Sequence, residues 1–273
     1  MTTPLLLLSL FACADGPSEE TLVSDLQVIA TVAEPPEVAP GEQVSLRTVV
    51  ADPQERGAEV LTWLCTPVGG ACLEASQPLD QWVHLGASAE DSASLVVSPA
   101  LGAALTQTDE VAAVAWVLAC EPGLCPVVEE ARADLEQGVL SPDLGAALSD
   151  PVSWMADLPI AGVSLALRTV PVSLRTAEER NANPVLRVTG PEGAVLAEGL
   201  ESLEVEVEDQ DQETTVYGLA TAGGFGSPFS AVLGGTALLS YYAPAETVPA
   251  TLYVVAQDGR GGTAVWTGEA QVR

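Results

Sequence analysis

The segment LESLEVEVE, from Leu200 to Glu208, alternates apolar and acidic residues from Leu203 onward. Successive side chains of a β-strand point to opposite faces, so Leu203, Val205 and Val207 share one face and the intervening glutamates share the other. This period is typical of a strand that has one face in a core and one face in water. The segment therefore predicts a β-sheet protein.

Similar segments recur along the chain, and turns rich in Gly and Pro separate them. The 273 residues include 24 Gly and 20 Pro, and 48% are hydrophobic, which suits many short strands around substantial cores. The strands expected in a first domain are residues 26–32, 44–50, 60–65, 81–85, 94–98, 110–120 and 162–174. Those expected in a second domain are residues 200–208, 214–220, 237–242, 251–257 and 263–266. We predict an all-β protein with domains at 25–175 and 184–273 and a polar linker at 176–183.

Residues 129–157 interrupt the strand pattern of the first domain. Glu129 to Gly138 is helix-prone and ends at a glycine, and Ser141-Pro142 is typical of a helix N-cap followed by proline. We predict a short helical insertion with two alternative roles. It is either a recognition surface or a cover over an open sheet edge or core end, anchored by Trp154 and Leu158.

The second domain resembles a known family of repeats. The order Val205 to Asp209, Tyr217, Gly223-Gly224, Tyr242-Ala243-Pro244 and Tyr253 to Gly262 is similar to bacterial immunoglobulin-like repeats of the PKD and cadherin-like type. The resemblance covers about ninety residues, from Pro184 onward. It implies two tandem immunoglobulin-like β-sandwiches, because Val44 to Pro53 and Leu61-Thr62-Trp63 give a fainter echo in the first domain. Family members are typically extracellular spacers, adhesive modules or carbohydrate-contacting accessories.

The N-terminus resembles a bacterial lipoprotein signal. Leu5 to Leu10 is apolar and is followed by Phe11-Ala12-Cys13, although no Lys or Arg precedes it. A secretory signal needs about 7 to 15 apolar residues before its cleavage site, whereas a membrane span needs about 20. The alternative is a frayed first strand, but a leucine run lacks β-branching and alternation. We predict a signal peptide at 1–12, lipidation of Cys13, a tether at 13–24 and attachment to the cell envelope, at the outer membrane or surface of a Gram-negative bacterium.

The cysteine count agrees with export. Of five cysteines, lipidation of Cys13 leaves Cys65, Cys72, Cys120 and Cys125 as an even set suited to disulfides. Their spacings are wider than the tight pairs that zinc sites prefer. If the strands holding Trp63 and Trp116 are antiparallel neighbours, as the immunoglobulin-like topology implies, Cys65 and Cys120 lie at opposite ends of the sheet. We therefore predict the local bridges Cys65–Cys72 and Cys120–Cys125.

The charge balance is strongly acidic. Nine Arg and no Lys stand against 38 Asp and Glu, for a net charge of −29. This charge repels phosphate backbones, so we expect no nucleic-acid partner. The loop carrying Glu208, Asp209, Asp211 and Glu213 offers oxygen ligands of the kind that Ca²⁺ accepts, and a weak calcium site is one interpretation. The other is a solvated acidic face. No other cofactor is expected.

Catalytic signals are scarce in the sequence. His84 is the single histidine, and no nucleophile-elbow, zinc-protease or phosphate-binding lysine motif occurs. We predict a lipid-anchored envelope protein with a binding, adhesion or structural role, whose partners are the membrane and a protein or carbohydrate ligand. The alternative is a secreted hydrolase or carbohydrate-active accessory subunit that uses a carboxylate pair.

Overall fold

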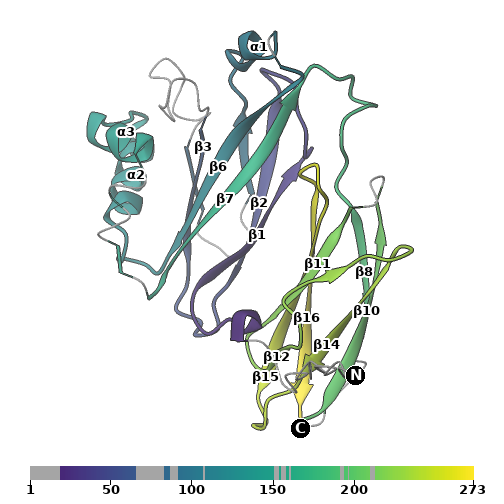
Figure 1. Cartoon of the computed structure of the whole chain (residues 1–273). Helices are drawn as coiled ribbons and strands as arrows, with labels where there is room; N and C mark the ends of the chain where they lie inside the picture. Colours follow the sequence, from purple (N-terminus) through teal and green to yellow (C-terminus); the bar gives the residue numbers. More distant parts are fainter. Residues whose placement is uncertain are drawn as a thin grey trace, which may run out of the picture.

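The protein is built from β-strands that gather into four sheets (Figure 1). The computed structural model describes residues 19–65, 83–86, 92–106, 108–150, 154, 158–159, 161–190, 194–195, 197–209 and 213–273. The signal peptide expected at 1–12 and Cys13 lie outside these residues. The all-β fold expected from the sequence is confirmed, with a first sandwich formed by the strands up to residue 173 and a second formed from residue 185 onward.

The first sandwich pairs a three-stranded sheet with a four-stranded sheet. The three-stranded sheet contains, in spatial order, β1 (Gln27–Glu34), β2 (Gln43–Ala51) and β5 (Ser92–Val96). The four-stranded sheet contains β4 (Val83–Gly86), β3 (Glu59–Cys65), β6 (Glu110–Cys120) and β7 (Val163–Ser173). Leu46 and Leu95 from the first sheet meet Leu64, Ala115 and Val170 from the second in a fully buried core.

The second sandwich pairs a four-stranded sheet with a five-stranded sheet. The four-stranded sheet contains β12 (Gly224–Phe225), β14 (Thr236–Tyr242), β10 (Leu200–Glu208) and β8 (Val185–Thr189). The five-stranded sheet contains β13 (Ser230–Ala231), β11 (Thr215–Ala220), β15 (Pro249–Gln257), β16 (Thr263–Val272) and β9 (Ala194–Val195). Leu203, Val205 and Val207 of β10 face the core, and the glutamates between them are exposed, as the alternation predicts.

Both sandwiches have an immunoglobulin-like strand order. In the first sandwich, β1, β2 and β5 form one sheet, and β3, β6 and β7 belong to the other. In the second, β8, β10 and β14 correspond to the first set, and β11, β15 and β16 correspond to the second. Neighbouring strands pair antiparallel throughout the described sheets, except that β9 runs parallel to β16. In the first sandwich, Trp63 of β3 pairs with Trp116 of β6. The same register places Cys65 opposite Val114 and Cys120 opposite Glu59, at opposite ends of the pair.

The predicted helical insertion is present as two helices, α2 (Pro126–Gln137) and α3 (Pro142–Ser149). Proline occupies the start of each helix, Gly138 ends α2 with a left-handed backbone, and Ser141 Oγ accepts a hydrogen bond from Leu144 N at 3.1 Å. The helices lie beside the outer face of the β4-β3-β6-β7 sheet (Figure 1). A third helix, α1 (Leu101–Ala104), and a 3-10 turn, η1 (Glu19–Thr21), complete the described elements.

The helical insertion covers the sheet face rather than a sheet edge. Leu144 and Leu148 of α3 are fully buried against the face that carries Leu61, Trp63 and Leu118. Trp63 stacks on Trp116 with ring centroids 5.9 Å apart and also contacts Trp154 at 6.3 Å. Because β3 and β6 are buried on both faces, they contain almost no polar positions.

The two sandwiches pack side by side through outer sheet faces. Ile29, Val49 and Ala51 of the first sandwich form one buried cluster with Tyr253 and Val255 of the second. These residues come from the β1-β2 face and the β11-β15-β16 face, which lie against each other in Figure 1. Tandem domains move independently unless their interface is large and apolar, so this buried cluster favours a single orientation.

The described part of the expected tether, residues 19–24, is folded onto the second sandwich. Val23 belongs to the interdomain cluster, and its N–H donates to Ala220 O at 2.8 Å. Thr21 Oγ1 accepts a hydrogen bond from Phe225 N at 2.8 Å and donates one to Phe225 O at 3.2 Å. The prediction of a tether over all of 13–24 was therefore wrong at its C-terminal end. The prediction failed because Thr21 and Val23 pair with strands about two hundred residues away, and no local sequence pattern reveals such a contact.

Replacing Trp63 by Ala should destabilise the first sandwich strongly. The substitution removes a fully buried ring and its stacking on Trp116. We expect a loss of about 3–5 kcal/mol in the free energy of unfolding, measured by urea denaturation with circular dichroism. Val139→Ala, at an exposed position after α2, is the matched control and should change stability by less than about 0.5 kcal/mol. Equal midpoints for the two variants would contradict the packing described.

Candidate functional site

In the described part of the chain, a network of polar groups lies at the junction of the two sandwiches, around Glu37. Glu37 follows β1, and its side chain is only 1% exposed. Ser173 Oγ, at the end of β7, donates to Glu37 Oε1 at 2.5 Å, and Asn181 N donates to Oε2 at 2.8 Å. Arg175 and Arg260 approach the same carboxylate at 3.2 and 3.3 Å. One buried carboxylate thus joins the first sandwich, the connecting segment and the β15–β16 turn.

The surroundings of Glu37 favour its ionised form. Burial by itself would raise the pKa of this carboxyl, but the hydrogen bonds from Ser173 and Asn181 and the charges of Arg175 and Arg260 outweigh it. The pKa of Glu37 is therefore lowered from its ordinary value of 4.5. A buried carboxylate that stays charged needs every one of its partners in place.

Asp258 and two asparagines form a second layer of the junction. Asn181 Nδ2 donates to Asp258 Oδ2 at 2.9 Å, and Asp258 Oδ1 accepts from Arg260 N and Gly262 N at 2.8 and 2.6 Å. Asn183 bridges the sandwiches, because its Nδ2 donates to Ala33 O at 2.7 Å and its Oδ1 accepts from Thr263 N at 2.8 Å. A β-carbon on Gly262 would overlap Asp258, so only glycine fits there. The segment at 176–183 thus connects the sandwiches as expected, but its asparagines hold it against both of them.

Arg168 of β7 lines a hollow of about 280 Å³ between β1, β7 and the β15–β16 turn. Its Nη2 donates to Gly261 O, while its buried Nε has no hydrogen-bond partner among the described residues. Burial lowers the pKa of the guanidinium, and the nearby Asp258 and Tyr217 oppose this change. Burial has the opposite effect on the phenol of Tyr217 and raises its pKa to about 12, because it disfavours the charged form of each group. Arg168 therefore attaches the turn of the second sandwich to β7 of the first.

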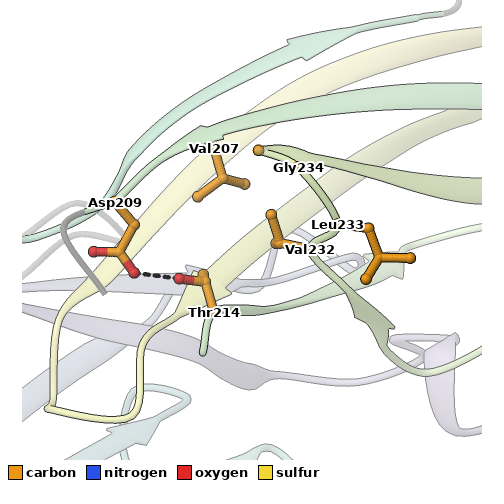
Figure 2. A pocket seen from close by; sticks show the side chains of 7 residues that line it. Val207, Asp209, Thr214, Val232, Leu233 and Gly234 are labelled. Carbon is orange, nitrogen blue, oxygen red and sulfur yellow. Dashed lines mark hydrogen bonds between the residues drawn. The ribbon is translucent and has the colours of Figure 1, made fainter. Parts of the chain in front are cut away.

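The expected calcium ligands are only partly assembled. Figure 2 shows Asp209 beside a pocket of about 500 Å³, where one of its carboxylate oxygens accepts a hydrogen bond from Thr214 Oγ1. The other oxygen is buried and has no partner in the described part of the chain. Glu208 points to the outer face, where Arg187 lies at 3.5 Å, and Glu213 is exposed.

Asp211, the remaining expected calcium ligand, lies outside the described residues. Among the residues that the structure does describe, no group of three His, Cys, Asp or Glu side chains is placed to hold a metal ion. Calcium binding at this loop stays a prediction from the sequence.

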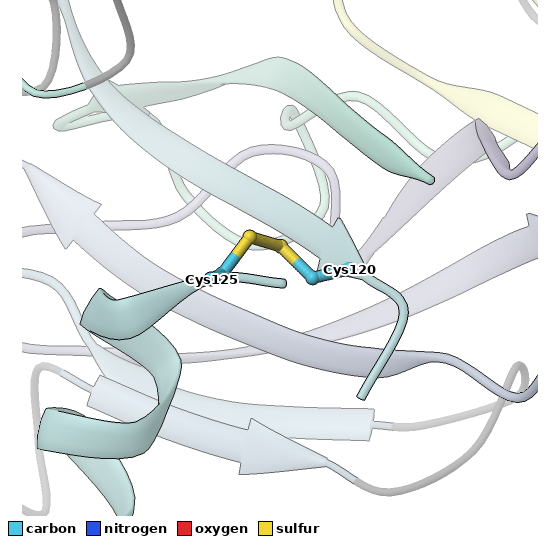
Figure 3. Close-up of a disulfide and its surroundings, with 2 residues drawn as sticks. All are labelled: Cys120 and Cys125. Carbon is cyan, nitrogen blue, oxygen red and sulfur yellow. A yellow bond between two sulfur atoms is a disulfide. The ribbon is translucent and has the colours of Figure 1, made fainter. Parts of the chain in front are cut away.

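The Cys120–Cys125 disulfide fixes the start of the helical insertion. Figure 3 shows the bond between the end of β6 and the first turn of α2, and the two Cα atoms lie 6.2 Å apart. Cys65 is also disulfide-bonded, while Cys72, its expected partner, lies outside the described residues. The pairing of Cys120 with Cys125 rules out a Cys65–Cys120 bridge, in agreement with the opposite ends that these cysteines occupy on β3 and β6.

The sequence signals did not single out the junction. Asp258 to Gly262 was recognised as a turn, and residues 176–183 as a polar connection, but neither pattern says that they meet Glu37. Two features of the sequence could have indicated the junction around Glu37. An Asp-Gly-Arg-Gly-Gly turn contains more glycine than a hairpin needs, and Asn181 and Asn183 stand in a short connection between strands.

Comparisons with known proteins find solved structures of low similarity to this chain. No protein-family model matches the chain, and no curated protein matches it. A conjugative transposon lipoprotein from Bacteroides eggerthii is 11% identical with a TM-score of 0.27, over 32% of this chain and 95% of the other. The Ig1-2 module of the Drosophila receptor tyrosine phosphatase DLAR is 11% identical with a TM-score of 0.30, over 91% and 99%.

The D0-D1 domain of intimin is also 11% identical, with a TM-score of 0.26, over 89% of this chain and 98% of the other. Scores this low carry no argument about function, and the immunoglobulin-like fold rests on the strand order given above. None of the helices in the described residues is long and apolar enough to cross a membrane.

Removing the Cys120–Cys125 bridge should loosen the helical insertion. The double variant Cys120→Ala/Cys125→Ala frees a short loop in the unfolded chain, so we expect stability to fall by about 2 kcal/mol in urea denaturation. Leu124→Ala, a substitution inside the same loop, is the control and should have a smaller effect. Peptide mapping that finds Cys120 bonded to Cys65 instead would contradict the structure.

Replacing Glu37 by Gln should weaken the junction and change its response to acid. The variant leaves Arg175 and Arg260 without their shared carboxylate, so we expect a loss of about 2 kcal/mol at neutral pH. In the wild type the pKa of Glu37 is lowered on folding, so its contribution is complete above the ordinary value of 4.5 and is lost as pH falls through the folded value. Denaturation midpoints below pH 4.5 should therefore fall less steeply in Glu37→Gln.

Glu208→Gln is the control for this experiment, because Glu208 is an exposed carboxylate with a single arginine neighbour. It should follow the wild-type pH profile. If Glu37→Gln also follows that profile, the ionised state of Glu37 does not hold the junction.

Proposed function

We propose that the chain is a lipid-anchored cell-envelope protein in which two immunoglobulin-like sandwiches form one rigid binding or structural body. The observation that carries the proposal is the interdomain junction. Ile29, Val49, Tyr253 and Val255 bury an apolar face, and the Glu37 carboxylate is bonded by groups on both sides of it. A fixed orientation between tandem domains suits a spacer or a scaffold that presents its loops in constant geometry.

Two features support attachment to the envelope. The apolar run Leu5 to Leu10 before Cys13 has the length of an export signal. The disulfide between Cys120 and Cys125, together with the bonded state of Cys65, suits an oxidising compartment outside the cytoplasm. With these three cysteines in bridges and Cys72 as the expected fourth, Cys13 is left for acylation.

The charged groups of the junction favour a structural role over catalysis. Glu37 and Asp258 are each saturated by hydrogen bonds from protein groups, and Glu37 is shielded from water. A general acid or base must reach a substrate, which these two carboxylates do not. The PKD or cadherin-like subtype, and a protein or carbohydrate ligand, remain part of this proposal on the strength of the sequence resemblance.

Replacing Cys13 by Ala should release the protein from membranes. Wild-type protein, expressed from its full chain in a Gram-negative host, should sediment with the membrane fraction and require detergent for extraction. The variant lacks the acylated residue and should be soluble, because the acyl chains supply the attachment. Ser18→Ala, in the same segment, is the control and should remain with the membranes. A wild-type protein that is soluble without detergent would contradict the proposal.

A further inference from the structure

The N-terminal segment enters the folded body at one edge of the second sandwich. Thr21 bonds both the N–H and the C=O of Phe225 in β12, and Leu22 forms a parallel bridge with Ala220 at the end of β11. β12 is the edge strand of its sheet. The first described residues of the chain, Glu19 to Leu22, are therefore fixed at this edge.

The same edge exposes a group of apolar side chains. Residues 226–229 lead from β12 to β13, which is the edge strand of the facing sheet. Phe229 is 64% exposed and Leu238 of β14 is 65% exposed. Together with the half-buried Tyr242 they line a hollow of about 340 Å³, whose other lining residues include Ser227 and Ser240. We call Phe229, Leu238 and Tyr242 the β12–β14 patch.

Chain length limits how far this patch can lie from an anchor at Cys13. Six residue steps separate Cys13 from Glu19, so the acylated residue lies within about 21 Å of Glu19, whatever path the chain takes. Four steps separate Phe225 from Phe229, a span of at most about 14 Å. These limits permit a lipid surface that holds Cys13 to contact the β12–β14 patch, which belongs to the same sandwich as the partners of Thr21 and Leu22.

We propose that the β12–β14 patch rests against the lipid surface, so that the second sandwich lies edge-on to the membrane beside its own anchor. This inference rests on the proposed lipidation of Cys13. Aromatic and aliphatic side chains with neighbouring hydroxyls suit the boundary between headgroups and acyl chains. Glu204 of β10 pairs with Leu238 and is exposed, and it marks where the sheet face turns to water.

The contact depends on apolar burial and not on charge. The chain carries a net charge of −29, which an anionic lipid surface repels. Phe229, Leu238 and Tyr242 are uncharged, so the contact should persist when salt concentration rises, whereas an electrostatic contact would weaken. Salt insensitivity is therefore part of the inference.

Photo-cross-linking to lipid tests the orientation directly. Benzoylphenylalanine is introduced in place of Phe229, or in place of Val139 as the control, in the full acylated chain held in native membranes. Val139 is 61% exposed and lies after α2 in the first sandwich, so the two positions match in exposure. We expect lipid adducts at position 229 to exceed those at position 139 by about fivefold or more, at low and high salt alike.

The outcomes separate this inference from the proposed function. If the probe-bearing proteins sediment with membranes but give equal lipid adducts, or if position 229 cross-links only to a second copy of the chain, the orientation is wrong and the anchoring stands. If wild type and both probe variants are soluble, the anchoring fails and the inference fails with it. Phe229→Ser/Leu238→Ser in the acylated chain should also move the lipid adducts of a Tyr242 probe toward the level at position 139.

Discussion

The buried carboxylate of Glu37 is the interaction on which the arrangement of the two sandwiches depends. It lies where three segments distant in sequence meet, namely the end of β1, the connection after β7 and the β15–β16 turn. A charge placed there is expensive to bury unless each partner is present, so the site tolerates only one relative position of the domains. Apolar burial in the interdomain cluster favours contact between the sandwiches but does not fix their relative orientation, because the hydrophobic effect is non-directional. The hydrogen bonds and ion pairs of Glu37 fix that orientation.

The helical insertion solves a different problem of burial. β3 and β6 are apolar on both faces, so the sheet that contains them needs a second layer beyond the facing sheet. The helices α2 and α3 provide it, and Trp63, Trp116 and Trp154 fill the space between them and the sheet. The Cys120–Cys125 disulfide joins the end of β6 to the start of α2, so α2 cannot move far from the strand that it covers.

Local patterns in the sequence predicted the elements well and their mutual contacts poorly. The apolar residues of β10 recur with a period of two. Gly138 follows a helix-prone stretch, and glycine readily adopts the left-handed backbone that ends a helix. Both elements could therefore be predicted from a few neighbouring residues. That the strands of Trp63 and Trp116 are antiparallel neighbours followed once the immunoglobulin-like order was assumed, but the pairing of the two rings was not predicted. Glu37 was not accessible, because its partners stand 136 to 223 positions away and nothing near it signals burial. Residues 19–24 were misread for the same reason.

The docking of Thr21 and Val23 onto the second sandwich has a consequence for the order of folding. Leu22 pairs with Ala220 and Thr21 with Phe225, so the first described segment of the chain cannot reach its place until β11 and β12 of the second sandwich exist. Contacts of such long sequence separation form late and slowly. The face of β1 and β2 that the second sandwich covers is therefore exposed during synthesis. Because synthesis starts at the N-terminus, residues 19–24 are made before the strands that they pair with, and translation interrupted before the second sandwich is complete would leave an uncovered apolar face on β1 and β2.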